Sequence, residues 1–206
     1  MATTGEPRPA RRSSGRPPQL SRDDIVSAAL AVIDADGLEA LTMRRLGAEL
    51  GVAAMSLYRH LPNREAVLAA VVNHLATEAI TDLDPGRSWA ESLTAFATAY
   101  RQMLLNHPRA VPLLATHPMD VHTGLALIQV VLDRADTEGV PRTHALTAVQ
   151  SVAVFVLGHA LAQVGTPPGT SATAVETPEA TEYYDRWFAE GLAAMVTGFV
   201  RPAPIE

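Results

Sequence analysis

The chain has 206 residues, of which 48% are hydrophobic, enough to bury a sizeable core and to exclude a chain that is disordered throughout. It contains no cysteine, which excludes disulfides, thiolate metal sites and a cysteine nucleophile. The net charge is −6, but positive charge is concentrated in residues 1–22 and 40–64, so the total does not exclude nucleic acid as a partner.

The N-terminal segment differs in composition from the rest of the chain. Residues 1–20 are rich in Pro, Arg and Ser, and we predict a disordered tail there. The tail has no apolar core, so we do not expect it to be a secretory signal. Order is expected from Ser21, a residue type that caps helices, and the first helix is expected to end at Gly37.

Two short helices and a longer one are predicted next from the capping residues and the apolar spacing. Thr42 is expected to cap a second helix that runs through Leu50, and Gly51 turns the chain into a third helix at about 54–60. Asn63 is expected to cap a long helix over 64–82. Further helices are predicted near 88–106, 109–115, 120–138, 142–164 and 179–200.

No useful length of the sequence alternates with period two, so no strands are predicted. The apolar run at 148–164 is interrupted by polar residues and is interpreted as a buried helix of a bundle, not as a membrane span. The sequence therefore predicts an all-α fold: an N-terminal three-helix unit joined by a linking helix to a C-terminal helical bundle.

Residues 43–62 have the spacing of a helix-turn-helix. Such a unit needs a small residue where its helices cross, here Gly47, and a glycine at the turn, here Gly51. Apolar residues that fix the angle between the helices stand at Leu46, Leu50, Val52 and Leu57. A tight pair of helices with no DNA-binding function has the same pattern, so both interpretations stay open on these positions alone.

A longer segment, residues 20–75, resembles the DNA-binding region of the TetR (tetracycline-repressor) family of bacterial regulators. The similarity is carried by GLEALTMRRLG (37–47), GV (51–52), LYRHL (57–61) and NREAVL (63–68). The C-terminal half is similar to the tetracycline-repressor branch through HPRAV (107–111) and FVLGHALAQ (155–163). The resemblance implies a tail at 1–20, a DNA-binding domain at 21–65 and an effector-binding and dimerisation domain at 66–206.

The resemblance also implies a role for each residue at the DNA. The phosphate contacts would be Thr42, Tyr58, His60 and Arg64, and the base-edge contact would be Arg44. Residues facing the major groove would be Ala54, Met55 and Ser56, with Arg59 beside them and Arg45 as a further candidate. Other readings stay open: Tyr58 as a core aromatic, His60 as a packing residue, and Arg44, Arg45 or Arg64 as solvated surface charge.

The third helix departs from the family pattern at its start. The family often has a capping residue where this sequence has Ala53, and losing a cap costs about 1 kcal/mol. Ala54 and Met55 have no hydrogen-bonding side chain, which leaves apolar contact with thymine methyl groups as their only direct readout of bases.

The C-terminal half contains weaker candidates. Phe96, Tyr100 and Met103 lie on helices that would surround a central cavity, although aromatic and Met residues at helical spacing also suit a core. A two-fold dimer interface on the last two helices would use Val152, Phe188, Leu192, Met195 and Phe199.

No metal site or cofactor is expected. His107, His117 and His122 with Asp120 lack a strong metal-ligand spacing and are interpreted as structural or surface residues, with a metal site or a contact with the inducer as the alternatives. The histidine through which the tetracycline branch coordinates its metal–drug complex aligns with Leu114 or Ala115, so tetracycline is not the expected inducer.

The expected function is a cytoplasmic, homodimeric regulator of transcription that is not an enzyme and has no membrane partner. It would be a repressor released from palindromic double-stranded operator DNA by an unidentified small-molecule effector. The alternative is a helical small-molecule-binding protein or an enzyme without DNA activity.

Overall fold

The computed structural model describes residues 20–81, 83–84, 88–117, 119–165 and 177–200, and within them no strand occurs, as the sequence predicts. The tail at 1–19 lies outside the described residues. In chain order the elements are α1 (Arg22–Asp36), the 3-10 helix η1 (Leu38–Ala40), α2 (Met43–Glu49), α3 (Ala54–Leu57), α4 (Arg64–Thr81), α5 (Trp89–Asn106), the 3-10 helix η2 (Pro108–Ala110), α6 (Val111–Thr116), α7 (Val121–Thr137), α8 (Arg142–Val164) and α9 (Pro178–Val200).

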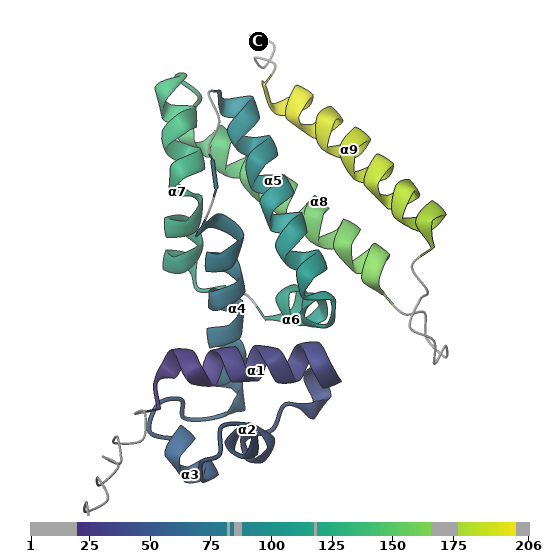
Figure 1. Ribbon diagram of the computed structural model, residues 1–206. Coiled ribbons are helices and arrows are strands. Elements are labelled where there is room, and N and C mark those ends of the chain that lie inside the picture. Colours follow the sequence, from purple (N-terminus) through teal and green to yellow (C-terminus); the bar gives the residue numbers. More distant parts are fainter. Residues whose placement is uncertain (1–19, 82, 85–87, 118, 166–176, 201–206) are drawn as a thin grey trace, which may run out of the picture.

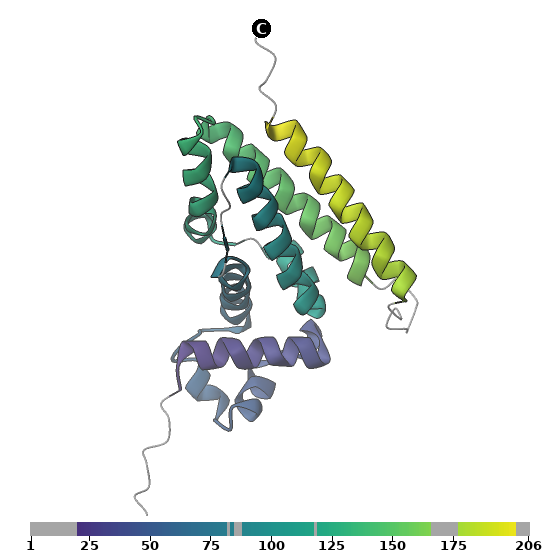
Figure 2. The same cartoon turned by 45° about the horizontal axis from the view of Figure 1, so that its top comes forward.

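The molecule has a small head and a larger body. Helices α1, α2 and α3 form the head, and α4 rises from it into the body, with α1 lying across the lower part of α4 (Figure 1). The body consists of α5 to α9, with α9 outermost and packed along α8 (Figure 2). One continuous hydrophobic core runs from the head to the body.

Local side-chain caps fix where the helices of the head begin. The Ser21 hydroxyl accepts a hydrogen bond from the Asp24 N–H at 3.0 Å, and the Asp24 carboxylate accepts one from the Ser21 N–H at 2.8 Å. The Thr42 hydroxyl accepts from the Arg45 N–H at 3.0 Å. Gly37 ends α1 at φ +86°, a conformation that favours glycine. These predicted caps and this predicted end are confirmed.

Helix α3 is shorter than predicted, because it ends at Leu57 and not at residue 60. No side chain caps its start at Ala53. At its end, the N–H groups of His60 and Leu61 both donate to the Leu57 carbonyl, at 2.9 and 3.0 Å, and Leu61 is buried in the core. The chain therefore turns inward at Leu61 before α4 begins.

Helix α8 is a core helix of the body. By length and composition alone it would suit a membrane span, with a mean hydropathy of 1.7 in its most apolar window. It contacts α5, α6, α7 and α9, and Val152, Val156 and Ala160 are fully buried. The interpretation of this segment as a buried bundle helix is confirmed.

The packing of α9 on α8 argues against three residues of the predicted dimer interface, which stays a prediction. Val152, Phe188 and Leu192 are buried inside a single chain, and the Phe188 ring stacks on Phe155 with ring centres 6.0 Å apart. These three side chains belong to the core of one chain and are not exposed to a second copy. Met195 and Phe199 are half-buried against the same core.

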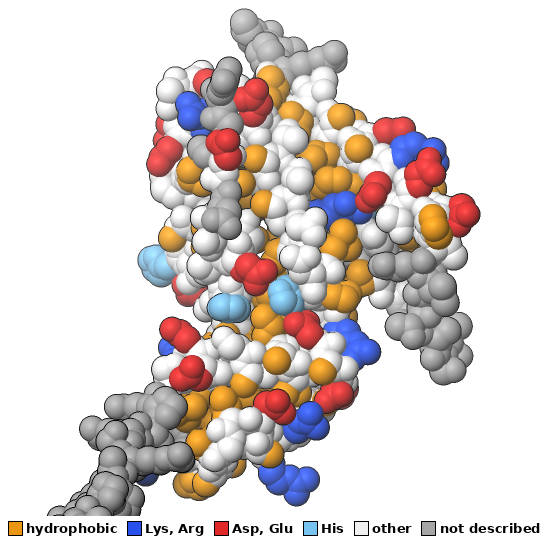
Figure 3. Space-filling view, in the orientation of Figure 1, with side chains coloured by type: hydrophobic (Ala, Val, Ile, Leu, Met, Phe, Trp, Pro, Cys, Tyr) orange, Lys and Arg blue, Asp and Glu red, His pale blue; other side chains and the backbone are white. Residues whose placement is uncertain are grey.

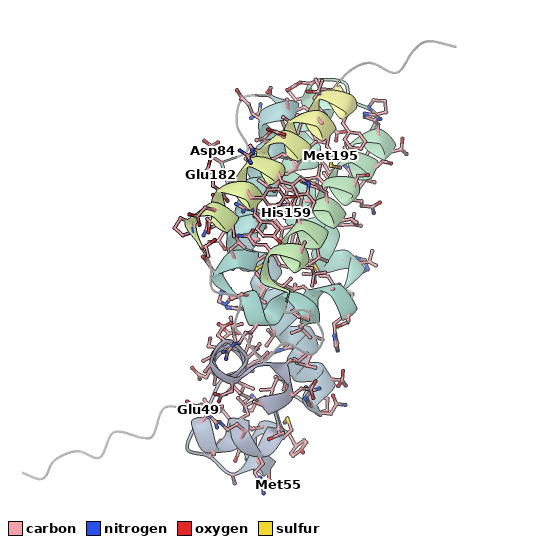
Figure 4. All side chains as sticks on the ribbon, turned by 90° about the vertical axis from the view of Figure 1, so that its right-hand side faces the viewer. Glu49, Met55, Asp84, His159, Glu182 and Met195 are labelled. Atoms are coloured by element: carbon pink, nitrogen blue, oxygen red, sulfur yellow. The ribbon has the colours of Figure 1, made fainter. Side chains whose placement is uncertain are left out.

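His159 is enclosed by aromatic rings between α8 and α9 (Figure 4). Its Nε2 lies 3.0 Å from the Tyr184 carbonyl, and the ring centre of Trp187 lies 4.7 Å from its own. A carbonyl only accepts, so Nε2 carries the hydrogen. Burial lowers the pKa of His159 below its usual 6.5, with the positive charge of Arg101 adding to the effect.

The lowered pKa predicts that His159 makes the folded state less stable in mild acid. Below pH of about 6.5 the unfolded chain binds a proton at this histidine that the folded chain does not, so the free energy of unfolding falls as pH falls. Urea unfolding between pH 7.5 and 5.5 should show a steeper loss for the wild type than for His159→Gln, which keeps an N–H donor but does not titrate. Equal slopes for the two proteins would contradict this assignment.

Candidate nucleic-acid interface and ligand cavity

Helices α2 and α3 pack closely because position 47 has no side chain. A Cβ added at Gly47 would lie 2.9 Å from the Val52 carbonyl oxygen and 3.2 Å from the Ala54 backbone nitrogen. Gly51 turns the chain between the two helices at φ +66°. The predicted roles of both glycines in the helix-turn-helix are confirmed.

The end of the head that points away from the body exposes much of α3 and the turn after it. The Met55 side chain is 73% exposed and lies at the tip of the head (Figure 4). Tyr58, Arg59 and His60 are also exposed, whereas Ala54 and Ser56 are half-buried. Figure 3 shows basic and hydrophobic side chains at this end of the molecule.

Two of the predicted cations lack a carboxylate partner among the described residues. Arg44 and Arg59 are exposed, and none of the ion pairs found in the described part of the chain includes them. Thr42 is also exposed, but its hydroxyl is engaged as the cap of α2. Arg44 and Arg59 are therefore positive charges at the surface that are available to an anionic partner.

Arg45 differs from Arg44 because its charge is compensated within the head. Its guanidinium lies 3.0 Å from the Asp36 carboxylate at the end of α1 and 3.8 Å from that of Glu49 on α2. The contact with Asp36 links α1 to α2, and the contact with Glu49 lies within α2. They favour the reading of Arg45 as a structural surface charge over the predicted contact with DNA.

Arg64 is likewise engaged inside the head. Its Nε donates to the Leu41 carbonyl at 2.8 Å, and one terminal nitrogen donates to the Leu38 carbonyl at 3.0 Å. Another terminal nitrogen lies 3.6 Å from the Glu65 carboxylate. Arg64 thus fastens the connection between α1 and α2 to the start of α4, a role that the sequence did not reveal.

The body contains a partly open cavity of about 380 Å³ between α4, α5, α7 and α8. Of the three predicted lining residues, Phe96 and Tyr100 lie in its wall, and Met103 does not. Met103 is 2% exposed and belongs to the solid core. The described wall consists of Ala76, Ala79, Ile80, Phe96, Tyr100, Met119, Asp120, Val121, Gly124, Leu125, Leu127, Ile128, Leu146, Val149, Gln150 and Ala153.

A cluster of charged and polar groups joins the head to the body. His107, at the end of α5, places Nδ1 2.8 Å from the Asp34 carboxylate of α1 and Nε2 3.4 Å from the Glu78 carboxylate of α4. Arg109 donates to the Ala35 carbonyl. Figure 3 shows histidine and acidic side chains at this waist of the molecule. The reading of His107 as a structural residue is supported.

A second histidine makes a similar link nearby. His117, at the end of α6, lies 3.4 Å from the Glu65 carboxylate near the start of α4. In the described part of the chain, no group of three His, Cys, Asp or Glu side chains is placed to hold a metal ion.

The chain matches two family models. Residues 25–71 match the model described as bacterial regulatory proteins, tetR family, and residues 83–182 match the model of a tetracyclin repressor-like C-terminal domain. The first match covers most of the head and the start of α4, and the second covers most of the body.

Individual relatives agree with these matches. An HTH-type transcriptional regulator of Saccharopolyspora erythraea is 33% identical over 156 residues, covering 76% of this chain and 66% of that protein. The HTH-type transcriptional repressor DrrR1 of Streptomyces coeruleorubidus is 31% identical over 156 residues, covering 75% of this chain and 57% of that protein. The chain therefore spans less than two thirds of the length of these relatives.

A solved structure gives the same result for the fold. The TetR family protein ActR of Streptomyces coelicolor, in complex with actinorhodin, has a TM-score of 0.71 and 28% identity to this chain, covering 88% of this chain and 97% of that one. With a helix-turn-helix head, a body that contains a cavity, and matches along most of its length, the chain belongs to the tetR family of bacterial regulatory proteins.

Proposed function

We propose that this protein is a DNA-binding transcriptional repressor of the bacterial cytoplasm whose hold on its operator is weakened by a small molecule in the body cavity. The observation that carries the proposal is the exposed tip of the head, where Met55 and two cations without carboxylate partners project from a helix-turn-helix. The relatives support it, since DrrR1 is a transcriptional repressor and the ActR structure holds actinorhodin.

Contacts to DNA would divide between positioning and reading. Tyr58 and His60, both exposed, would contact phosphates and set the register of the head on the duplex. Arg44 would reach a base edge, most favourably guanine, and Met55 would contact thymine methyl groups. Arg64 is removed from the predicted phosphate contacts in this proposal, because its donors are engaged within the head.

A palindromic operator requires two heads. We place the contact between two copies on the outer sides of α8 and α9, which lie side by side in Figure 4. Val154 is 72% exposed there and Trp187 is 41% exposed, while Gly158 would permit close approach. Two-fold pairing through these helices would set the heads in successive major grooves, about 34–36 Å apart.

Helix α4 would carry the signal from the cavity to the head. Its C-terminal half supplies Ala76, Ala79 and Ile80 to the cavity wall, and its first turn holds Arg64, which is bonded to the loop before α2. The His107–Asp34 contact gives the body a second attachment to the head, at α1. A ligand that shifts α4 against α5 would therefore turn the head, with a coupling free energy of about 1–3 kcal/mol.

Removal of Arg44 tests the DNA-binding role. Arg44→Ala is expected to lose sequence preference, because a good side-chain contact to a base edge contributes about 1–3 kcal/mol of discrimination. The measurement is fluorescence anisotropy with promoter DNA adjoining the protein's own gene and with scrambled DNA of equal length, across a range of salt concentrations.

Arg142→Ala is the matched control, since this arginine is exposed at the start of α8 in the body, where its guanidinium makes surface contacts with Asp136 and with the side-chain oxygen of Gln129. If the wild type and Arg44→Ala bind promoter DNA with equal affinity, and that affinity depends equally weakly on salt concentration, the proposal is contradicted. That result would favour a helical small-molecule-binding protein without DNA activity.

A further inference from the structure

We infer that the ligand of the body cavity is a largely apolar molecule without negative charge, with an aromatic system and one hydrogen-bond acceptor that meets the Tyr100 hydroxyl. The inference rests on the proposed function in taking this cavity as the effector site. It adds the chemical class of the effector, which follows from the side chains in the cavity wall.

Apolar side chains make up most of the cavity wall. Helix α4 presents Ala76, Ala79 and Ile80, and α7 presents Leu125 and Ile128. A cavity of about 380 Å³ with such a wall suits a drug-sized molecule that leaves water mainly through burial of its apolar surface. The aromatic pair Phe96 and Tyr100, stacked with ring centres 6.0 Å apart, offers a flat surface for a ring system.

The charges at the cavity disfavour an anion. No Lys, Arg or His belongs to the wall as far as the structure describes it, and Asp120 lies at the exposed edge. The N-terminus of α7 would attract an anion, but the Asp120 carboxylate already caps it, accepting from the Thr123 N–H at 3.0 Å. That hydrogen bond lowers the pKa of Asp120, so the edge is negative at neutral pH. A carboxylate or phosphate ligand would be buried without a cation.

Tyr100 is the one polar side chain of the described wall that is not exposed, since Asp120 and Gln150 both are. Its hydroxyl has no hydrogen-bond partner among the described residues, and burial raises the pKa of Tyr100 to about 12. The phenol therefore stays protonated and can donate to a ligand. Gln150, the other uncharged polar side chain of the wall, is exposed at its edge. A carbonyl or ether oxygen within an apolar molecule would satisfy the Tyr100 donor.

A neutral naphthalene ketone, 6-propionyl-2-dimethylaminonaphthalene, is a suitable probe because its emission moves to shorter wavelength in apolar surroundings. Titrated into the full-length protein without DNA, it should bind with blue-shifted emission. Methyl 2-naphthoate should displace it, and 2-naphthoate, which has the same rings and a carboxylate, should not. Displacement by the anion as effectively as by the ester would overturn the inferred class.

Variants locate the probe and its hydrogen bond. Tyr100→Phe should weaken binding about five- to tenfold, as expected for the loss of one hydrogen bond, and should shift the emission further to the blue. Tyr183→Phe, which removes an exposed hydroxyl from α9, should bind as the wild type does. Unchanged affinity and emission in Tyr100→Phe would remove Tyr100 as the donor.

Filling the cavity is a second test that does not depend on Tyr100. Ala153→Phe, which adds a ring at the wall, should abolish probe binding while thermal unfolding stays cooperative. Undiminished binding would place the probe elsewhere and overturn the inference. Operator binding is measured in a separate experiment. If the protein prefers the neutral probe but does not bind DNA, only the proposed function is contradicted. A protein that binds its operator but takes the anion contradicts only the ligand class.

Discussion

Gly47→Val is expected to abolish operator binding while leaving the body folded. The first added carbon would lie 2.9 Å from the Val52 carbonyl oxygen and 3.3 Å from the Ala54 Cα, and both are backbone atoms that cannot rotate away. Gly47 also accepts a hydrogen bond from the Val52 N–H at 2.9 Å, so the turn cannot open without losing it. Overpacking of this kind costs about 1–3 kcal/mol, which a small head with marginal stability cannot absorb without changing the angle between α2 and α3.

Tryptophan fluorescence reports the folding of the body independently of the head, because both tryptophans, Trp89 and Trp187, lie in the body. Anisotropy with labelled operator should show no specific binding by Gly47→Val, while tryptophan emission reports a body that unfolds as in the wild type. Ala126→Val, which places the same side chain on the exposed side of α7, should bind operator normally. Binding by Gly47→Val within about twofold of wild type would show that the close crossing is not required.

Arg64→Ala is expected to loosen the head and thereby to weaken binding to every DNA sequence. The substitution removes the hydrogen bonds to the Leu41 and Leu38 carbonyls, and hydrogen bonds to charged groups contribute about 1.5–3 kcal/mol each before allowance for partial exposure. Limited proteolysis, with the fragments identified by mass spectrometry, should show faster cleavage between α1 and α2 than in the wild type. Arg142→Ala should be cleaved like the wild type.

Arg64→Lys distinguishes this role from a phosphate contact. Lysine keeps the positive charge, but its single ammonium cannot reproduce the fork that reaches two carbonyls. We expect Arg64→Lys to resemble Arg64→Ala in both cleavage and operator affinity. The opposite result would be that Arg64→Lys binds DNA like the wild type, while Arg64→Ala reduces the slope of log affinity against log salt concentration by about one. Arg64 would then contact a phosphate, and the structural role would be wrong.

The helix starts were predictable because their causes are local. Ser21, Thr42 and Asn63 cap the helices that follow them through contacts three residues along the chain. Gly47 and Gly51 were predictable for the same reason, since spacing along the chain places one at a crossing and the other at a turn. The end of α3 was not, because it depends on Leu61 entering a core made by distant residues.

Helical periodicity predicted only some of the residues that line the cavity. Phe96, Tyr100 and Met103 share one face of α5 by helical spacing, so the sequence assigns them together. Met103 is one turn further along, where α5 approaches α6 (Figure 1), and there the core is filled. Periodicity identifies the inward face of a helix, but whether a void lies against it depends on the neighbouring helices.

By itself the sequence determined the all-α fold and the helix-turn-helix, because these depend on residues close together in the chain. Only the tertiary structure decided that Arg45 and Arg64 are engaged within the head, that Val152, Phe188 and Leu192 face inward, and that His107 fastens the body to α1. Those roles depend on partners as far as 73 residues away. The sequence alone does not identify which distant residue an apolar or charged side chain contacts, because only folding brings the two residues together.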